Sequence, residues 1–268
     1  MSYAVVKSAS GAIYALHQIA LVTEEDAPTK HPLVKGVRQA AKRRIGLKLQ
    51  NQKDPLDLDI LQTGIVRYVP DLETCPLIYL VVAAMVGTMW TGFLRYKDMK
   101  FVWVELVNFF PTHMEALLTE RKNDQFREGD VVYIARGTRR DTCPVALCEA
   151  LISRARLSGS VNLFQGWDGR AARFRPLEAQ LNGRHMEYPQ CRREVHKFLQ
   201  RTTGMSEAEV PKKWGTQSLR SGGATVAARK VSFRLFQQHG AWHTASSAHR
   251  YILDPTETRL SVTRALGY

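Results

Sequence analysis

Hydrophobic residues recur at helical spacing along most of the chain, and this pattern predicts a mainly helical protein. The first such stretch covers residues 3–20, and a charged segment followed by Pro28 ends it. A second predicted helix runs from Pro32 to about Leu47, with apolar residues every four positions along one face. Basic residues lie on another face of that helix, so we expect it to be amphipathic.

Beyond a predicted linker over residues 50–55, the helical pattern resumes and is interrupted only once. Helices are predicted over residues 57–68 and 76–90, and the second is apolar on nearly every side, which predicts burial. Helical spacing also returns after Pro144. The helices expected there are 144–157, 187–203, 217–230, 232–239, 243–252 and 256–266, with a loop from Gly166 to Leu181.

Between Phe101 and Arg136 the pattern becomes typical of short strands separated by turn residues. The predicted strands are 102–107, 113–118 and 131–135, and their simplest arrangement is an antiparallel meander. Lys122 would lie near the tip between the second and third strands. The expected fold class is therefore α+β and mainly α, with a small three-stranded antiparallel sheet. Residues 1–51 and 52–268 are the expected domains.

Composition and charge favour a folded protein with a polyanionic partner. Of the 268 residues, 44% are hydrophobic, which is enough for a core, and the net charge is +13. Nucleic acid is the usual partner of such a chain, and an anionic membrane surface is the alternative. The longest apolar run, Leu77 to Met89, is too short to span a bilayer.

The basic charge is concentrated between residues 27 and 53, which hold eight Lys or Arg and no acidic residue. We interpret this run as a helix that contacts phosphates, and an ordinary solvated basic face is the alternative. The residues expected to bind DNA are Lys35, Arg38, Lys42, Arg43 and Arg44.

Cysteine and histidine spacing gives no sign of a metal site or a cofactor. The four cysteines form no CxxC pair, and no histidine cluster completes a set of metal ligands. We interpret the cysteines as free thiols of an intracellular protein. The N-terminus lacks the pattern of a signal peptide.

Four segments carry arginine, lysine, tryptophan and tyrosine residues in a distinctive order: Thr91 to Arg95, Arg121 to Asp124, Thr216 to Ala224, and Trp242 to Tyr251. In that order they resemble the active site of the tyrosine recombinase (phage-integrase-type) family, over nearly all of residues 55–268. Details around Asp124 and Ser218 are more similar to recombinases of eukaryotic mobile elements, which implies a nuclear protein.

The resemblance implies DNA strand cleavage and rejoining through a 3′-phosphotyrosine, without a metal or another cofactor. Tyr251 would be the nucleophile, and a phenol needs activation because its pKa lies near 10. Arg95 and Arg220 would clamp the scissile phosphate, since a guanidinium fork binds two oxygens and stays charged. Lys122 would be the general acid, and Trp242 would wall the site and donate its indole N–H.

The family also implies an assembly. A helical catalytic domain would follow a partial helical core-binding domain, which clamps DNA and would occupy residues 1–51. Several protomers, as a homo-oligomer and expected tetramer, would assemble on double-stranded DNA.

Each of these residues also has an ordinary structural interpretation. Tyr251 and Trp242 are alternatively packing residues, and Lys122 an exposed turn lysine. Arg95 is alternatively paired with Asp98, which could also orient it for phosphate binding. Arg220 is alternatively an exposed arginine in a helix that Thr216 would cap.

Gln217 departs from the family, which usually has histidine three residues before the second arginine. A glutamine amide donates a hydrogen bond to phosphate but takes up no proton. A catalytically inactive, recombinase-derived DNA-binding protein is therefore the main alternative. A topoisomerase-like enzyme and an RNA-binding or structural helical module are the others.

Overall fold

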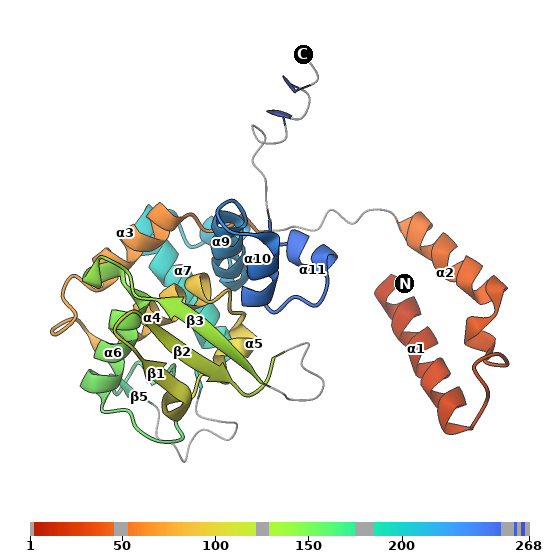
Figure 1. Ribbon diagram of the computed structural model, residues 1–268, viewed down its shortest axis with the longest axis horizontal. Helices are drawn as coiled ribbons and strands as arrows, with labels where there is room; N and C mark the ends of the chain where they lie inside the picture. The colour runs from red at the N-terminus through yellow and green to blue at the C-terminus, as the bar shows by residue number, and fades with distance from the viewer. Residues whose placement is uncertain are drawn as a thin grey trace. The chain divides into compact units, whose positions relative to one another are not determined.

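The computed structural model describes residues 3–45, 53–121, 129–174, 185–252, 260–261 and 264–265. It divides into two compact units, residues 1–52 and 53–268. The first unit pairs α1 (Tyr3–Ile19) with α2 (Pro32–Ile45) through a short 3-10 helix, η1 (Pro28–Lys30) (Figure 1). Both helices agree with the hydrophobic spacing, as far as the described residues extend.

The two helices of the first unit leave much of their apolar surface uncovered. Ala27 is buried at the connection, whereas Ile19 is 79% exposed and Leu33 is 73% exposed. Leu16 and Val37 are exposed as well. The apolar face that the spacing predicts on α2 therefore exists, but the unit itself does not bury it.

The second unit is built around α4 (Leu77–Thr91), which is the helix that the sequence predicts to be buried. Every residue from Leu80 to Trp90 is buried. Four helices pack against it, so its apolar surface is covered on several sides. They are α3 (Leu58–Tyr68), α6 (Pro144–Ala155), α7 (Tyr188–Thr203) and α9 (Thr216–Ala228).

A three-stranded antiparallel sheet lies beside these helices and confirms the predicted meander (Figure 1). Its strands are β1 (Val107–Phe109), β2 (His113–Leu118) and β3 (Asp130–Ala135). Val107 lies opposite Ala116, and His113 lies opposite Ala135. Alternate residues of β2 are buried, which is the pattern of a sheet with one face on the core.

The first strand starts later than predicted, because residues 102–106 do not join the sheet. Val104–Leu106 forms a 3-10 helix, η2. Before it, the carbonyl of Val102 accepts a hydrogen bond from the Leu163 amide, and the Val104 amide donates to Val161. The backbone groups of this stretch are thus satisfied by the segment at 161–163 rather than by β2.

Several short elements complete the second unit, and the sequence pattern missed most of them. Four-residue helices and two-residue strands are too short to show a period. The predicted helix at 256–266 falls largely outside the described residues, and that at 243–252 is shorter than expected. The short elements of the second unit are α5 (Tyr96–Met99), η3 (Arg140–Thr142), β4 (Trp167–Asp168), β5 (Arg173–Phe174), α8 (Val210–Lys213), α10 (Phe233–His239) and α11 (Ala245–His249).

The close approach of α9 to α4 depends on a glycine. A Cβ atom added at Gly223 would collide with the carbonyl oxygen of Trp90. The indole of Trp90 in turn donates to the carbonyl of Leu56 at 2.9 Å. The residues around Gly223 on α9 are therefore held against the end of α4, and Arg220 is among them.

The four cysteines are buried free thiols, as predicted. In the part of the chain that the structure describes, no helix combines the length and the apolar character that crossing a membrane requires.

Candidate functional site

A second, smaller hydrophobic core forms where α9, α10 and α11 meet the turn after α4. It consists of Phe93, Ala224, Phe236, Trp242 and Ala248. The rings of Phe236 and Trp242 are 4.7 Å apart between centroids. Tyr251 packs against this core from its edge and is half-buried. The core brings together segments that lie far apart in the sequence.

Arg220 lies on α9 with its side chain completely buried, at 0% exposure. The helix begins differently from the prediction, because Gly215 is the N-cap and Thr216 is the first helical residue. The hydroxyl of Ser218 accepts a hydrogen bond from the Gly215 amide at 3.1 Å. The predicted cap at Thr216 is therefore wrong by one position, and Thr216 is instead buried.

The guanidinium of Arg220 is bonded to two backbone carbonyls. One terminal nitrogen donates to Phe93, and the other donates to Gly240 at 2.7 Å. Asp98 Oδ2 lies 3.8 Å from the first nitrogen, which makes a buried ion pair. Arg220 is thus not an exposed helix arginine. Burial, followed by the positive charge of Arg95, lowers its pKa to about 9, so Arg220 remains charged at neutral pH.

Arg95 lies at the start of α5 and is partly exposed. Its Nε donates to the hydroxyl of Tyr251 at 3.3 Å. Asp98 Oδ2 accepts from the backbone amide of Arg95 at 2.7 Å, while its ion pair is with Arg220. Asp98 therefore holds the backbone that carries Arg95 and neutralises part of the Arg220 charge.

Trp242 and Tyr251 cover the guanidinium of Arg220. The Cζ atom of Arg220 is 4.8 Å from the centroid of each ring, a cation–π distance, and the two rings are 5.3 Å apart. Thr225 on α9 also donates to the carbonyl of Tyr251 at 3.1 Å. The structure thus brings Arg95, Arg220, Trp242 and Tyr251 into one cluster.

Two other predicted site residues have different places. Lys122 lies outside the described residues. Gln217 is exposed in the first turn of α9, one helical turn before Arg220. The predicted DNA-binding residues all lie on α2, in the first unit. Lys35, Lys42, Arg43 and Arg44 are exposed, and Arg38 is partly exposed.

Arg121 and His239 are two residues near the site whose roles the sequence did not indicate. Arg121 is buried and paired with Asp130 of β3, and its positive charge contributes to the lowered pKa of Arg220. His239 ends α10, and its Nε2 lies 2.8 Å from the carbonyl oxygen of Thr91. Only the folded chain brings His239 to Thr91, so no local pattern could have identified this contact.

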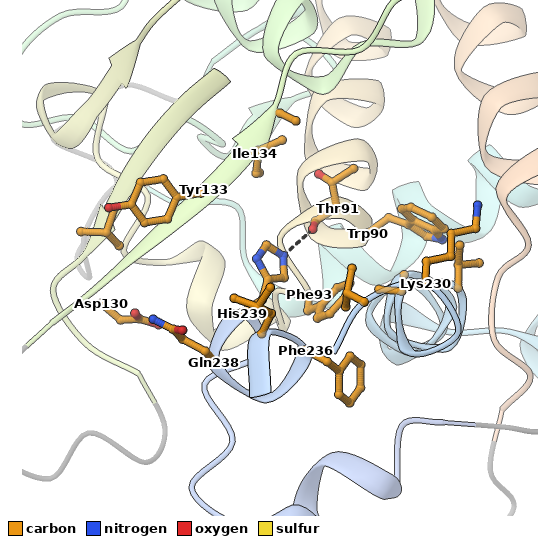
Figure 2. Close-up of a pocket in the computed structure, with 17 residues that line it drawn as sticks. Trp90, Thr91, Phe93, Asp130, Tyr133, Ile134, Lys230, Phe236, Gln238 and His239 are labelled. Carbon is orange, nitrogen blue, oxygen red and sulfur yellow. Dashed lines mark hydrogen bonds between the residues drawn. The ribbon is translucent and has the colours of Figure 1, made fainter. Parts of the chain in front are cut away.

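A cavity of about 650 Å³ lies between the end of α4, β3 and the helices α9 and α10 (Figure 2). Its walls are largely apolar and include Trp90, Phe93 and Phe236. Among the residues that the structure describes, no group of three or more His, Cys, Asp or Glu side chains is arranged to hold a metal ion.

Comparisons with solved structures give the fold. XerH recombinase in a post-cleavage complex with palindromic difH has a TM-score of 0.55 and 11% identity over 77% of this chain. The match covers 52% of that recombinase, so this chain spans about half its length.

Two further structures match nearly the whole chain. The Tn1549 transposon integrase with transposon right-end DNA has a TM-score of 0.57 and 12% identity over 98% of this chain and 80% of the other. XerA recombinase has a TM-score of 0.53 and 12% identity over 98% and 82%. No family model and no curated protein matched. The chain has the fold of the tyrosine recombinase catalytic domain, which confirms the predicted fold class.

Proposed function

We propose that this protein cleaves and rejoins DNA strands, with Tyr251 forming a 3′-phosphotyrosine. One observation carries the proposal: the hydroxyl of Tyr251 is bonded to Arg95, 156 positions away, while its ring lies over the guanidinium of Arg220. A nucleophile between two cations is what phosphoryl transfer needs. The recombinase fold supports the same conclusion, and two of the three recombinases compared above, XerH and the Tn1549 integrase, are in complexes with DNA.

In the proposed reaction, the Tyr251 oxygen attacks the phosphorus and the bond from phosphorus to the 5′-oxygen breaks. The phenolic proton passes to water, and the leaving 5′-oxygen takes up a proton to become a hydroxyl. Lys122 is the proposed donor of that proton. The phosphate stays on Tyr251, so the reverse attack by a 5′-hydroxyl reseals DNA without a nucleotide cofactor. Arg95 and Arg220 stabilise the charge on the non-bridging oxygens.

Access of phosphate to Arg220 requires a local movement. Both terminal nitrogens of Arg220 are bonded to carbonyls, and two aromatic rings cover its guanidinium. Within the described residues, Arg220 Nε and Trp242 Nε1 are buried donors without a partner. Buried donors of this kind are rare in folded proteins, and an anion satisfies them. We therefore infer that Tyr251 moves off Arg220 when DNA binds.

The basic residues of α2 supply the second part of the proposal. Exposed lysines and arginines on one helix suit contacts to consecutive phosphates of duplex DNA. We propose a homo-oligomer on DNA, with a tetramer as the working unit of strand exchange. We propose that the protein is a recombinase of a eukaryotic mobile element and acts in the nucleus. The motifs around Ser218 are the basis of this proposal.

A recombinase-derived DNA-binding protein without catalysis is the second candidate, and Gln217 favours it. The side chain at this position is exposed one turn before Arg220, where a histidine would exchange protons and glutamine does not. Both candidates predict DNA binding. They differ in whether a covalent intermediate forms.

Covalent capture separates the two candidates. The full chain is incubated with a pool of duplexes of random sequence, each nicked so that the released fragment diffuses away. We expect a protein–DNA adduct that survives denaturant and chelator in the parent and is absent in Tyr251→Phe. Tyr133→Phe is the matched control, because it removes the same atom from an exposed strand tyrosine. An adduct in Tyr251→Phe would show that another residue is the nucleophile. Binding without any adduct in the parent would favour the inactive protein.

A further inference from the structure

Two turns beside the cluster have unusual backbone conformations. The first turn covers residues 91–95 and ends in Arg95, and the second covers residues 239–242 and ends in Trp242. Phe93 in the first has φ of 49°, and Ala241 in the second has φ of 47°. A left-handed conformation is unfavourable for a residue with a side chain, so it persists only when its surroundings hold it.

Arg220 connects these two turns through hydrogen bonds. It donates to the carbonyl of Phe93 in the first turn and to the carbonyl of Gly240 in the second. The carbonyl of Phe93 belongs to the first left-handed residue, and the carbonyl of Gly240 adjoins the second, Ala241. The same guanidinium that would face phosphate therefore also fixes the backbone that carries Arg95 and Trp242.

His239 connects the same two turns through another hydrogen bond. Because a carbonyl oxygen only accepts, the His239 ring donates from Nε2 to Thr91 at 2.8 Å (Figure 2). Thr91 is the last residue of α4, where carbonyls lack partners within the helix. The ring also meets Phe93 edge-on, with centroids 4.6 Å apart at 87°. His239 thus joins the end of α10 to the end of α4, next to both left-handed residues.

We propose that His239 is a positioning residue for the Tyr251 site: its hydrogen bond to Thr91 holds the two turns together and so sets the placement of Arg95 and Trp242. The inference rests on the proposed function for its catalytic consequence, but its structural part stands on the contacts above. The hydrogen of Nε2 is directed to Thr91, so His239 acts through the backbone rather than on the reacting atoms. Burial also lowers the pKa of His239, which keeps the ring neutral near pH 7.

Three substitutions in the full chain test the role of this hydrogen bond. His239→Gln keeps an N–H at the same number of bonds from the backbone, and His239→Met keeps the length without a donor. His196→Met is the matched control, because His196 is also half-buried with a pKa lowered by burial, but lies on α7. Circular dichroism and thermal melting confirm that each variant is folded before it is used.

Hydrogen exchange measured by mass spectrometry reads the turns without requiring activity. The amides of Gly92 and Leu94 report on the first turn, and those of Ala241 and Trp242 on the second, because each donates within its own turn or helix end. We expect at least about tenfold faster exchange in both turns for His239→Met. His239→Gln and His196→Met should remain within about twofold of the parent. Unchanged protection in His239→Met would overturn the proposal.

The adduct assay reads the consequence for the site. At saturating nicked DNA, we expect His239→Met to form the adduct about 10–100-fold more slowly, because small displacements of reacting groups have effects of this size. Its dissociation constant for DNA should stay within about twofold of the parent, and His239→Gln should recover most of the rate. Equal rates in His239→Gln and His239→Met would refute a role for the hydrogen bond. No adduct in the parent would reject the proposed function, and the exchange measurement would still decide the positioning role.

Discussion

The buried arginine of the site and the basic face of α2 use positive charge in opposite ways. Arg220 has no exposed surface and is held by two carbonyls, a carboxylate and two aromatic rings. Lys35, Lys42 and their neighbours on α2 extend into solvent. A buried charge is held in one geometry and its removal leaves its partners unpaired, whereas exposed charges act by number. The two regions should therefore respond very differently to the loss of a single side chain.

Replacing Arg220 should produce the largest change in stability. Arg220→Met leaves the buried carboxylate of Asp98 without its ion pair and two carbonyls without donors, which costs about 3–5 kcal/mol. Arg95→Met is the matched comparison, because Arg95 is partly exposed and its Nε donates to one hydroxyl. We expect this variant to lose about 1 kcal/mol of unfolding free energy. Urea denaturation of both variants measures the difference. Equal losses would mean that the burial of Arg220 does not set its importance.

Gln217 tests whether the site is complete apart from one residue. If the cluster is intact, Gln217→His should raise the rate of adduct formation by up to about 10²-fold, the low end of general acid–base effects. Gln217→Asn is the control, because it keeps an amide and adds no titratable group. The rate is measured at saturating nicked DNA. A histidine variant no faster than the parent would place the deficiency elsewhere in the site.

The fold was largely predictable from the sequence where periodic segments are long. The buried helix at 77–91 was predictable because apolar residues occupy nearly every side of it. The meander was predictable because apolar and polar residues alternate along its strands. The segment at 102–106 was predicted as strand because it is apolar. Its partner at 161–163 lies about sixty positions away, and no local pattern reveals such a pairing.

The candidate site shows the same limit. Arg95, Arg220, Trp242 and Tyr251 were found through an ordered resemblance, which carries information about distant contacts that spacing alone does not. The ion pair of Asp98 with Arg220 was not predicted. The sequence suggested only an alternative pairing of Asp98 with the guanidinium of Arg95, three positions away. His239 had no signal, since its partner is a backbone carbonyl and every residue type offers one.

The basic face of α2 should change by increments. Replacing Lys35, Arg38 and Lys42 with alanine should flatten the plot of log affinity against log salt by about 0.9 for each phosphate that is no longer neutralised. The triple variant Lys35→Arg, Arg38→Lys and Lys42→Arg keeps every charge and should keep the slope. Fluorescence anisotropy on a short duplex between about 50 and 200 mM salt measures both. An unchanged slope in the alanine variant would remove α2 from the interface.

The smallest expected effect concerns acidity at His239. Burial lowers the pKa of this histidine below its ordinary value of 6.5, and the bond to Thr91 opposes that shift only in part. As pH falls through 6.5, the unfolded chain binds a proton before the folded one does, so this residue's contribution is present above pH 6.5 and is lost below it. Arg121, Asp130 and Arg220 are the charged groups that act on the ring.

We therefore expect the parent to lose stability between pH 7.5 and 5.5 by up to about 1 kcal/mol more than His239→Gln, since one full proton is worth 1.36 kcal/mol per pH unit. Urea midpoints of the two proteins at both pH values give this difference directly, and groups common to both cancel. His196→Gln is the control, because burial also lowers the pKa of His196. This variant shows how much pH-dependent stability a buried histidine outside the site contributes. If the parent and His239→Gln lost the same stability, His239 would have the same proton affinity in the folded and unfolded chain. Burial would then not outweigh the opposing effect of the bond to Thr91, and the expected direction of the pKa shift would be wrong.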